Sequence, residues 1–152
     1  MESINQILVV SRMTKYCARA VQQGVSLAKK YEAGLTVIHV VHDPFGLEGW
    51  NLPMPSLEKD YQSLLKKSRQ QLDDIIANEN KSGMRIDVLI REGDPTAEIL
   101  AVIKEKKIDL AIMLAHEEGR LEHFLFGRSN EALIRKMPCS LLLVKKEPGA
   151  VA

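Results

Sequence analysis

Short apolar runs alternate with longer stretches of helical periodicity along this chain, and this alternation constrains its fold more than any other feature. A wholly apolar run such as ILVV at residues 7–10 is expected of a strand covered on both faces, because such a strand has no solvent-facing positions. Strands separated by single helices form parallel sheets with right-handed crossovers. We therefore expect an α/β fold: an open, doubly wound, Rossmann-like sheet of parallel strands with helices on both faces. The five strands are predicted at residues 7–10, 35–41, 85–90, 110–114 and 140–144.

The helices expected between these strands have recognisable start signals. Asp94 and Pro95 form the strongest one, because an aspartate side chain caps the first N–H groups and a proline fits the first turn. Thr14 can cap the first helix in the same way. A long amphipathic helix is predicted over residues 56–80, and the last helix over residues 129–137. The apolar face of the first helix is predicted to consist of Cys17, Ala20, Val21, Val25, Leu27, Ala28 and Tyr31.

The length and charge of the chain exclude several classes of protein. Its 152 residues suffice for one domain, so residues 1–152 are expected to form a single unit. With 21 Lys+Arg against 20 Asp+Glu, the formal net charge is +1, which gives no field to attract nucleic acid or an anionic membrane. Aromatic residues make up only 5% of the chain, which argues against binding by base stacking. We expect no nucleic-acid and no membrane partner.

The cysteines and the N-terminal residues indicate a cytoplasmic protein. No apolar run approaches the roughly 20 residues that span a bilayer, and MESINQILVV lacks the basic region of a signal peptide. Cys17 and Cys139 lack the spacing of a metal site or of a redox pair. Two reduced thiols without a partner are typical of the cytosol, so a cytoplasmic location is expected.

Residues 42–55 (HDPFGLEGWNLPMP) differ in kind from the rest of the chain. Three prolines, two glycines and the only tryptophan indicate an irregular loop between two elements. Such a loop is either a lid over a site or partner-contact surface anchored by Trp50, or a cover for the edge of the sheet. Residues 147–152 are expected to be a flexible tail.

Several segments of the chain, in the same order, resemble the universal stress protein (UspA-type) family. They are ILVV with KYCARAVQQGVSLAKKYEAGLTVIHVV, then IREGDPTAEIL, then DLAIMLAH with FGRSNEALIRKMPCSLLLV. The resemblance implies an adenine nucleotide alpha hydrolase-like fold and a ligand site at the ends of the first and fourth strands. The segment MLAHEEGRLEHFLF also resembles the first domain of tandem, E-type members, so the question whether the native protein has a second domain stays open.

Nucleotide-binding members of that family carry Gly-x₂-Gly-x₉-Gly-Ser/Thr after the fourth strand. The first two glycines fall on Leu114 and Glu117 of this chain, so two small residues of that motif are replaced. The third falls on Gly127, the only glycine of the motif that this chain keeps, and the hydroxyl position on Arg128, with Ser129 one place late. The candidate ligand cleft implied by the resemblance comprises Arg12, Val41, Met113, His116, Gly127, Arg128 and Ser129.

These replacements weaken the expectation of ordinary ATP binding. A branched Leu114 occupies a position where the backbone approaches a ribose-phosphate, and Glu117 adds like charge beside a polyphosphate. Arg12 and Arg128 can either compensate with positive charge or pair with nearby glutamates and fill the cleft themselves. We therefore expect a regulatory or protective stress-response binding protein with a degenerate nucleotide pocket, no cofactor and no enzymatic activity. The alternatives are an ATP/AMP-binding switch that uses Mg²⁺ and hydrolyses slowly, or a cleft for a different small ligand.

No catalytic or metal centre is predicted. His116 and His123 flank a stretch with glutamates, but their spacing is not that of a metal site. No nucleophile-elbow sequence and no candidate general base occurs.

The last strand is expected to mediate dimerisation. It is apolar and lies at the edge of the sheet in the family, where an unpaired strand exposes backbone N–H and C=O groups. The resemblance implies a homodimer, or a pseudo-dimer within a tandem chain, and an unknown protein partner is also possible. The dimer strand is predicted to consist of Leu141, Leu142, Leu143 and Val144.

Overall fold

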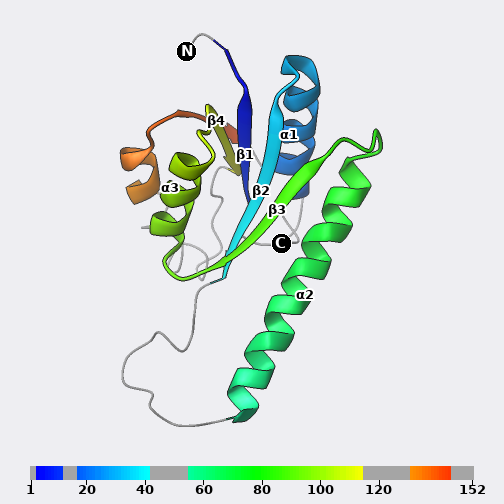
Figure 1. Ribbon diagram of the computed structural model, residues 1–152, viewed down its shortest axis with the longest axis vertical. Coiled ribbons are helices and arrows are strands. Elements are labelled where there is room, and N and C mark those ends of the chain that lie inside the picture. Colours follow the sequence, from blue (N-terminus) through cyan, green and yellow to red (C-terminus); the bar gives the residue numbers. More distant parts are fainter. Residues whose placement is uncertain (1–2, 12–16, 42–54, 115–130, 145–152) are drawn as a thin grey trace.

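Five parallel strands form one sheet in the order β3-β2-β1-β4-β5 (Figure 1). The computed structural model describes residues 3–11, 17–41, 55–114 and 131–144. All five predicted strands and the doubly wound α/β class are confirmed, with ends shifted by at most two residues. Besides a helical segment at 131–136, the elements are β1 (Gln6–Ser11), α1 (Ala18–Tyr31), β2 (Gly34–Val41), α2 (Pro55–Glu79), β3 (Ile86–Glu92), α3 (Pro95–Glu105), β4 (Leu110–Leu114) and β5 (Ser140–Val144).

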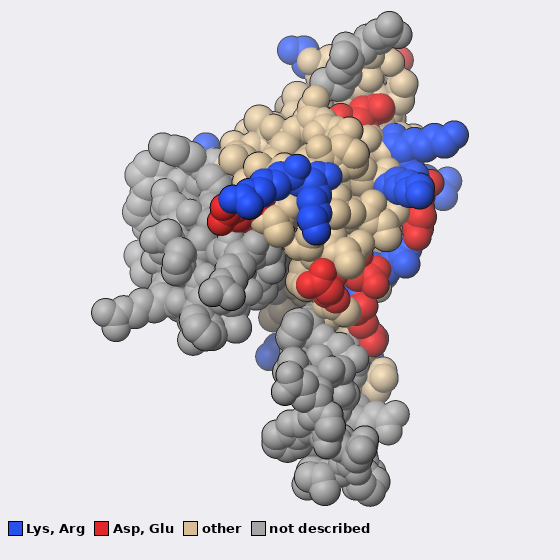
Figure 2. Space-filling model, turned by 90° about the vertical axis from the view of Figure 1, so that its left-hand side faces the viewer, with Lys and Arg blue, Asp and Glu red and all other residues tan. Residues whose placement is uncertain are grey.

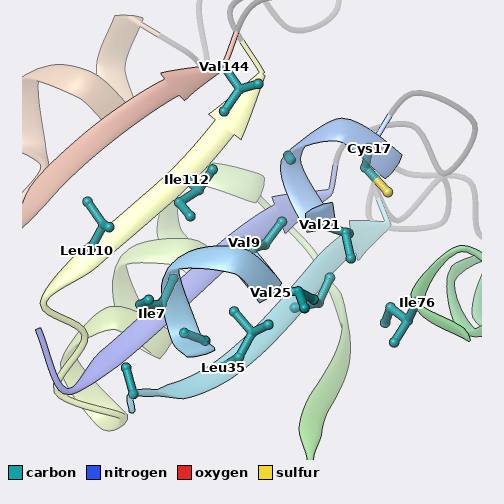
Figure 3. Packing of buried hydrophobic residues seen from close by; sticks show 14 of the residues in the cluster. Ile7, Val9, Cys17, Val21, Val25, Leu35, Ile76, Leu110, Ile112 and Val144 are labelled. Carbon is teal, nitrogen blue, oxygen red and sulfur yellow. The ribbon is translucent and has the colours of Figure 1, made fainter. Parts of the chain in front are cut away.

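Helices cover both faces of the sheet, and β1 shows why its run is apolar throughout. Ile7 and Val9 face the helices α1 and α2, in a core cluster that Figure 3 shows from close by. Leu8 and Val10 face the other way, toward α3 and the segment 131–136. Because successive side chains of a strand alternate between faces, residues 7–10 of a central strand buried on both sides have no solvent-facing position. Figure 1 shows the two layers of helices on either side of the sheet.

Helix α1 differs from the sequence prediction at its first and last residues. Cys17 is the residue before the helix, and its side chain makes no capping hydrogen bond. The predicted cap, Thr14, lies outside the described residues. Tyr31 was expected on the buried face and is 46% exposed, so that prediction is wrong. Tyr31 is the last residue of the helix, and the chain leaves the helical conformation at Glu32, whose φ is 52°.

Helix α2 is confirmed as a long amphipathic helix, and only part of it packs on the body of the protein. Its 25 residues correspond to a length of about 37 Å. Ser68, Leu72 and Ile76 are buried, whereas Gln62 and Ser63 are exposed. In Figure 1 the beginning of the helix extends past the carboxyl ends of the strands. The helix starts at Pro55, which the sequence analysis assigned to the end of the irregular loop. The rest of that predicted loop, residues 42–54, lies outside the described residues.

The start of α3 is as predicted. The Asp94 carboxylate accepts a hydrogen bond from the N–H of Ala97 at 2.9 Å, and Pro95 occupies the first turn. Ile99, Val102 and Ile103 form its buried face.

Candidate functional site at the switch point of the sheet

The sheet divides into two halves at its carboxyl edge. The pairing of β1 with β4 ends at Val9 and Ile112. Beyond this point β1 continues to pair with β2 as far as Ser11, and β4 continues to pair with β5 as far as Leu114. Because the chain winds in opposite directions from β1 and from β4, this is the topological switch point, where open α/β sheets bind their ligands. The predicted site between the ends of the first and fourth strands therefore lies where the strand order reverses.

A buried histidine holds the carboxyl end of β1 against β2. Nδ1 of His39 lies 3.0 Å from the carbonyl oxygen of Ser11. A carbonyl only accepts, so this ring nitrogen carries the proton and donates. Burial lowers the pKa of His39, and the hydrogen bond to Ser11 opposes that effect to a smaller extent. His39 is therefore neutral near pH 7 and acts as a fixed clamp on the end of β1.

The side chain of Ser11 lies beside that of Cys17, which is the residue immediately before α1. Ser11 is only 2% exposed, and its Oγ has no nitrogen or oxygen partner within the described ranges. Burial raises the pKa of the Cys17 thiol, and a hydrogen bond with the Ser11 side chain works against this to a smaller extent. A protonated, buried thiol is a poor nucleophile, so these groups do not form a catalytic pair.

Sequence reasoning missed this cluster of Ser11, Cys17 and His39. The one available signal was a polar residue ending an otherwise apolar strand, directly before Arg12. Nothing in the sequence placed His39 beside it.

Two of the predicted cleft residues are described. Val41 ends β2 and is nearly buried, and its carbonyl accepts the N–H of Gly93 at 3.1 Å. Gly93 has a φ of +128°, which side chains rarely tolerate, and this turn ties the ends of β2 and β3 together. Met113 is fully buried in the cluster that faces α3. Leu114, at the position of the first family glycine, is half-buried at the end of β4.

The remaining predicted cleft residues lie outside the described part of the chain, so their arrangement stays a prediction. They are Arg12, His116, Gly127, Arg128 and Ser129. Within the described ranges, no three or more His, Cys, Asp or Glu side chains are grouped so that they could hold a metal ion. Nor does any helix in those ranges combine the length and apolarity needed to cross a membrane.

Charges of both signs are interspersed on the face that carries α3 (Figure 2). Two ion pairs join β3 to the end of this helix: Arg91 with Glu105 at 3.2 Å, and Lys106 with Asp87 at 3.1 Å. They fix α3 against β3, although partly exposed pairs of this kind stabilise little.

The predicted dimer strand is an edge strand. Among the described strands, β5 pairs with β4 alone and forms one end of the sheet. Its side chains range from Val144, which is nearly buried, to Leu143, which is 47% exposed. Ile134, on the helical segment 131–136, is 45% exposed. In the described regions, Leu143, Ile134 and Tyr31 are the only large apolar side chains that are exposed to this degree.

Comparison with known proteins agrees with this architecture. The model of the universal stress protein family matches residues 3–145. Universal stress protein MJ0531 of Methanocaldococcus jannaschii is 33% identical over 132 residues, which cover 84% of this chain and 74% of that protein. The solved structure of universal stress protein UspA from Lactobacillus plantarum superimposes with a TM-score of 0.71 at 20% identity, covering 95% of this chain and 99% of that one. A universal stress protein solved in complex with cAMP has a TM-score of 0.61 at 15% identity and covers 96% and 100%. The chain belongs to the universal stress protein family.

Proposed function

We propose that this protein is a regulatory or protective binding protein that acts as a dimer and does not turn over ATP. The observation that supports this most directly is Leu114 at the end of β4, on the line where the sheet divides. A branched side chain there obstructs the close approach of a ribose-phosphate to the backbone. The nucleotide pocket of this member is then degenerate, and its function depends on partner contacts.

The edge strand β5 supports the dimer. Its outer N–H and C=O groups lack a neighbouring strand within the sheet, and pairing with β5 of a second copy satisfies them. Burial of the exposed Leu143 side chain in that interface adds hydrophobic stabilisation. Size-exclusion chromatography with light scattering tests the proposal. A dimeric mass is expected, and a clean monomer at micromolar concentration contradicts it.

A second function, a nucleotide-binding switch, has support from the related structure whose description names cAMP. In this mode Arg12, Gly127, Arg128 and Ser129 bind the phosphates, with Mg²⁺ where ATP is the ligand. Leu114 then limits the affinity without abolishing it.

Calorimetry with ATP, AMP and cAMP in the presence of Mg²⁺ separates the two functions. Micromolar binding that is lost in Gly127→Val contradicts the degenerate pocket, and no heat at millimolar nucleotide contradicts the switch. Leu114→Gly tests the obstruction itself, and Leu114→Ala is its matched control, because alanine keeps the β-carbon. If the branched side chain of Leu114 obstructs the site, both variants bind more tightly than the wild type, and the glycine variant binds at least as tightly as the alanine variant. Assays of released phosphate on the same samples test turnover, and none is expected.

A further inference from the structure

Two sulfur atoms meet at the amino edge of the sheet, between the helical segment 131–136 and β5. The thiol of Cys139 donates a hydrogen bond to the thioether sulfur of Met137 at 3.7 Å. Both side chains are half-buried and pack against the apolar cluster that faces α3. This sulfur pair, Met137 and Cys139, is therefore close to solvent, and it lies at the opposite edge of the sheet from the ligand cleft.

The backbone on both sides of the sulfur pair is anchored. The N–H of Met137 donates to the carbonyl of Ile134 at 3.4 Å, in the turn that follows the helical segment. Pro138 comes next, and its ring fixes its own φ and restricts the residue before it. Ser140 then enters β5, where it is paired with Leu110. Little conformational freedom therefore has to be lost for both sulfurs to bind one ligand.

The surroundings of Cys139 favour a cation in place of the thiol proton. Burial raises the pKa of the Cys139 thiol, a backbone hydrogen bond with Ala111 lowers it to a smaller extent, and the negative charge of Asp109 raises it. The hydrogen bond with Ala111 favours the thiolate, which is the form that binds metals. The negative charge of Asp109, which helps to retain the proton, attracts a metal cation in the same way.

The sulfur donors indicate which metal fits. Thiolate and thioether sulfurs are soft ligands that suit Cu(I). Structural Zn²⁺ sites use four ligands from Cys, His and carboxylate side chains, and the described ranges contain no group of three such residues. With metal–sulfur bonds of about 2.3 Å, two sulfurs 3.7 Å apart subtend an angle of roughly 107° at the metal. The pair can therefore bind one ion without a large movement of the backbone.

We propose that Met137 and Cys139 form a binding site for a soft monovalent cation, Cu(I). On binding, the thiol proton leaves to solvent and the metal takes its place between the two sulfurs, with no change in oxidation state. Two protein ligands leave the ion open to exchange, which suits a carrier or a sensor of Cu(I). The site goes beyond the function proposed above, because neither the nucleotide pocket nor the β5 contact contributes a ligand. Cysteine spacing could not indicate it, because its second ligand is a methionine.

Anaerobic titration of the 152-residue chain with Cu(I), in competition with a chromophoric Cu(I) chelator, tests the site. A Cys17→Ala background leaves Cys139 as the only cysteine of the sequence, and one Cu(I) per chain is expected. Met137→Leu should weaken binding at least about tenfold, since even residues that only orient metal ligands contribute about 10–100-fold. Cys139→Ser should remove the binding. Met84→Leu is the matched control, because Met84 is equally half-buried but packs against the other apolar cluster, and it should bind like the background chain.

Two further readouts identify the ligands. X-ray absorption should show two sulfur atoms around Cu(I) in the background chain and one in Met137→Leu. Because binding releases one proton, the affinity should rise about tenfold for each pH unit below the pKa of the thiol. Circular dichroism on the same variants checks that each is folded.

Equal affinity of the background chain and Met137→Leu for Cu(I) overturns the proposal, as does the absence of binding at micromolar Cu(I). Light scattering with and without the metal keeps the result independent of the dimer. One Cu(I) for every two chains indicates bridging between copies and contradicts the site. A monomer that binds one Cu(I) supports the site and contradicts only the dimer.

Discussion

Helix α1 lies so close to the sheet that one added methyl group should be destabilising. A Cβ at Gly24 would lie 2.5 Å from Cγ2 of Val9 and 3.2 Å from Cδ1 of Leu35. Val9 is fully buried and β-branched, so it cannot turn away, and α1 must shift instead. Helix propensity favours alanine over glycine by about 1 kcal/mol, whereas overpacking a core costs about 1–3 kcal/mol. Gly24→Ala should therefore lower the free energy of unfolding by up to about 2 kcal/mol.

Urea unfolding followed by circular dichroism measures this effect, and a double-mutant cycle assigns its cause. Val9→Ala removes the methyl group that clashes, so Gly24→Ala should cost nothing or should stabilise in that background. Ser26→Ala, on the exposed side of the same helix, is the control for propensity alone. If Gly24→Ala raises stability by about 1 kcal/mol, as propensity alone predicts, or costs the same in both backgrounds, the close-packing argument is refuted.

Three further predictions concern other parts of the molecule. Because folding lowers the pKa of His39, the unfolded chain binds a proton at this residue at a higher pH than the folded protein does. The free energy of unfolding should therefore keep the full His39 contribution above about pH 6.5 and fall as the pH drops below that value. His39→Gln should show a smaller loss between pH 7.5 and pH 5 in urea unfolding, and an equal loss argues against the clamp. Asp94→Ala should cost about 0.5–2 kcal/mol through the lost cap, and Asp94→Asn should recover most of it; equal values for the two contradict the capping role. Leu143→Lys should yield a monomer in light scattering, whereas Tyr31→Lys, at an equally exposed but remote position, should leave the dimer intact.

Local signals were sufficient to predict most of the secondary structure. Residues 7–10 of β1 and all of β4 are apolar because both faces of these strands are covered, and this pattern can be read without knowing the partners. The start of α3 is equally local, since Asp94 caps a helix that begins one residue later. Tyr31 shows the limit of periodicity, which does not reveal where the sheet beneath a helix ends.

The sequence by itself determined the order of strands and helices, and through it the doubly wound class, because hydrophobic periodicity and capping depend on neighbours a few residues apart. Only the tertiary structure decided which strands lie at the edges and where the sheet divides. It also brought Ser11, Cys17 and His39 together from the end of β1, the start of α1 and the middle of β2. A hydrogen bond across strands depends on the register of the strands and on the direction of the crossover, and neither can be read from the local sequence pattern.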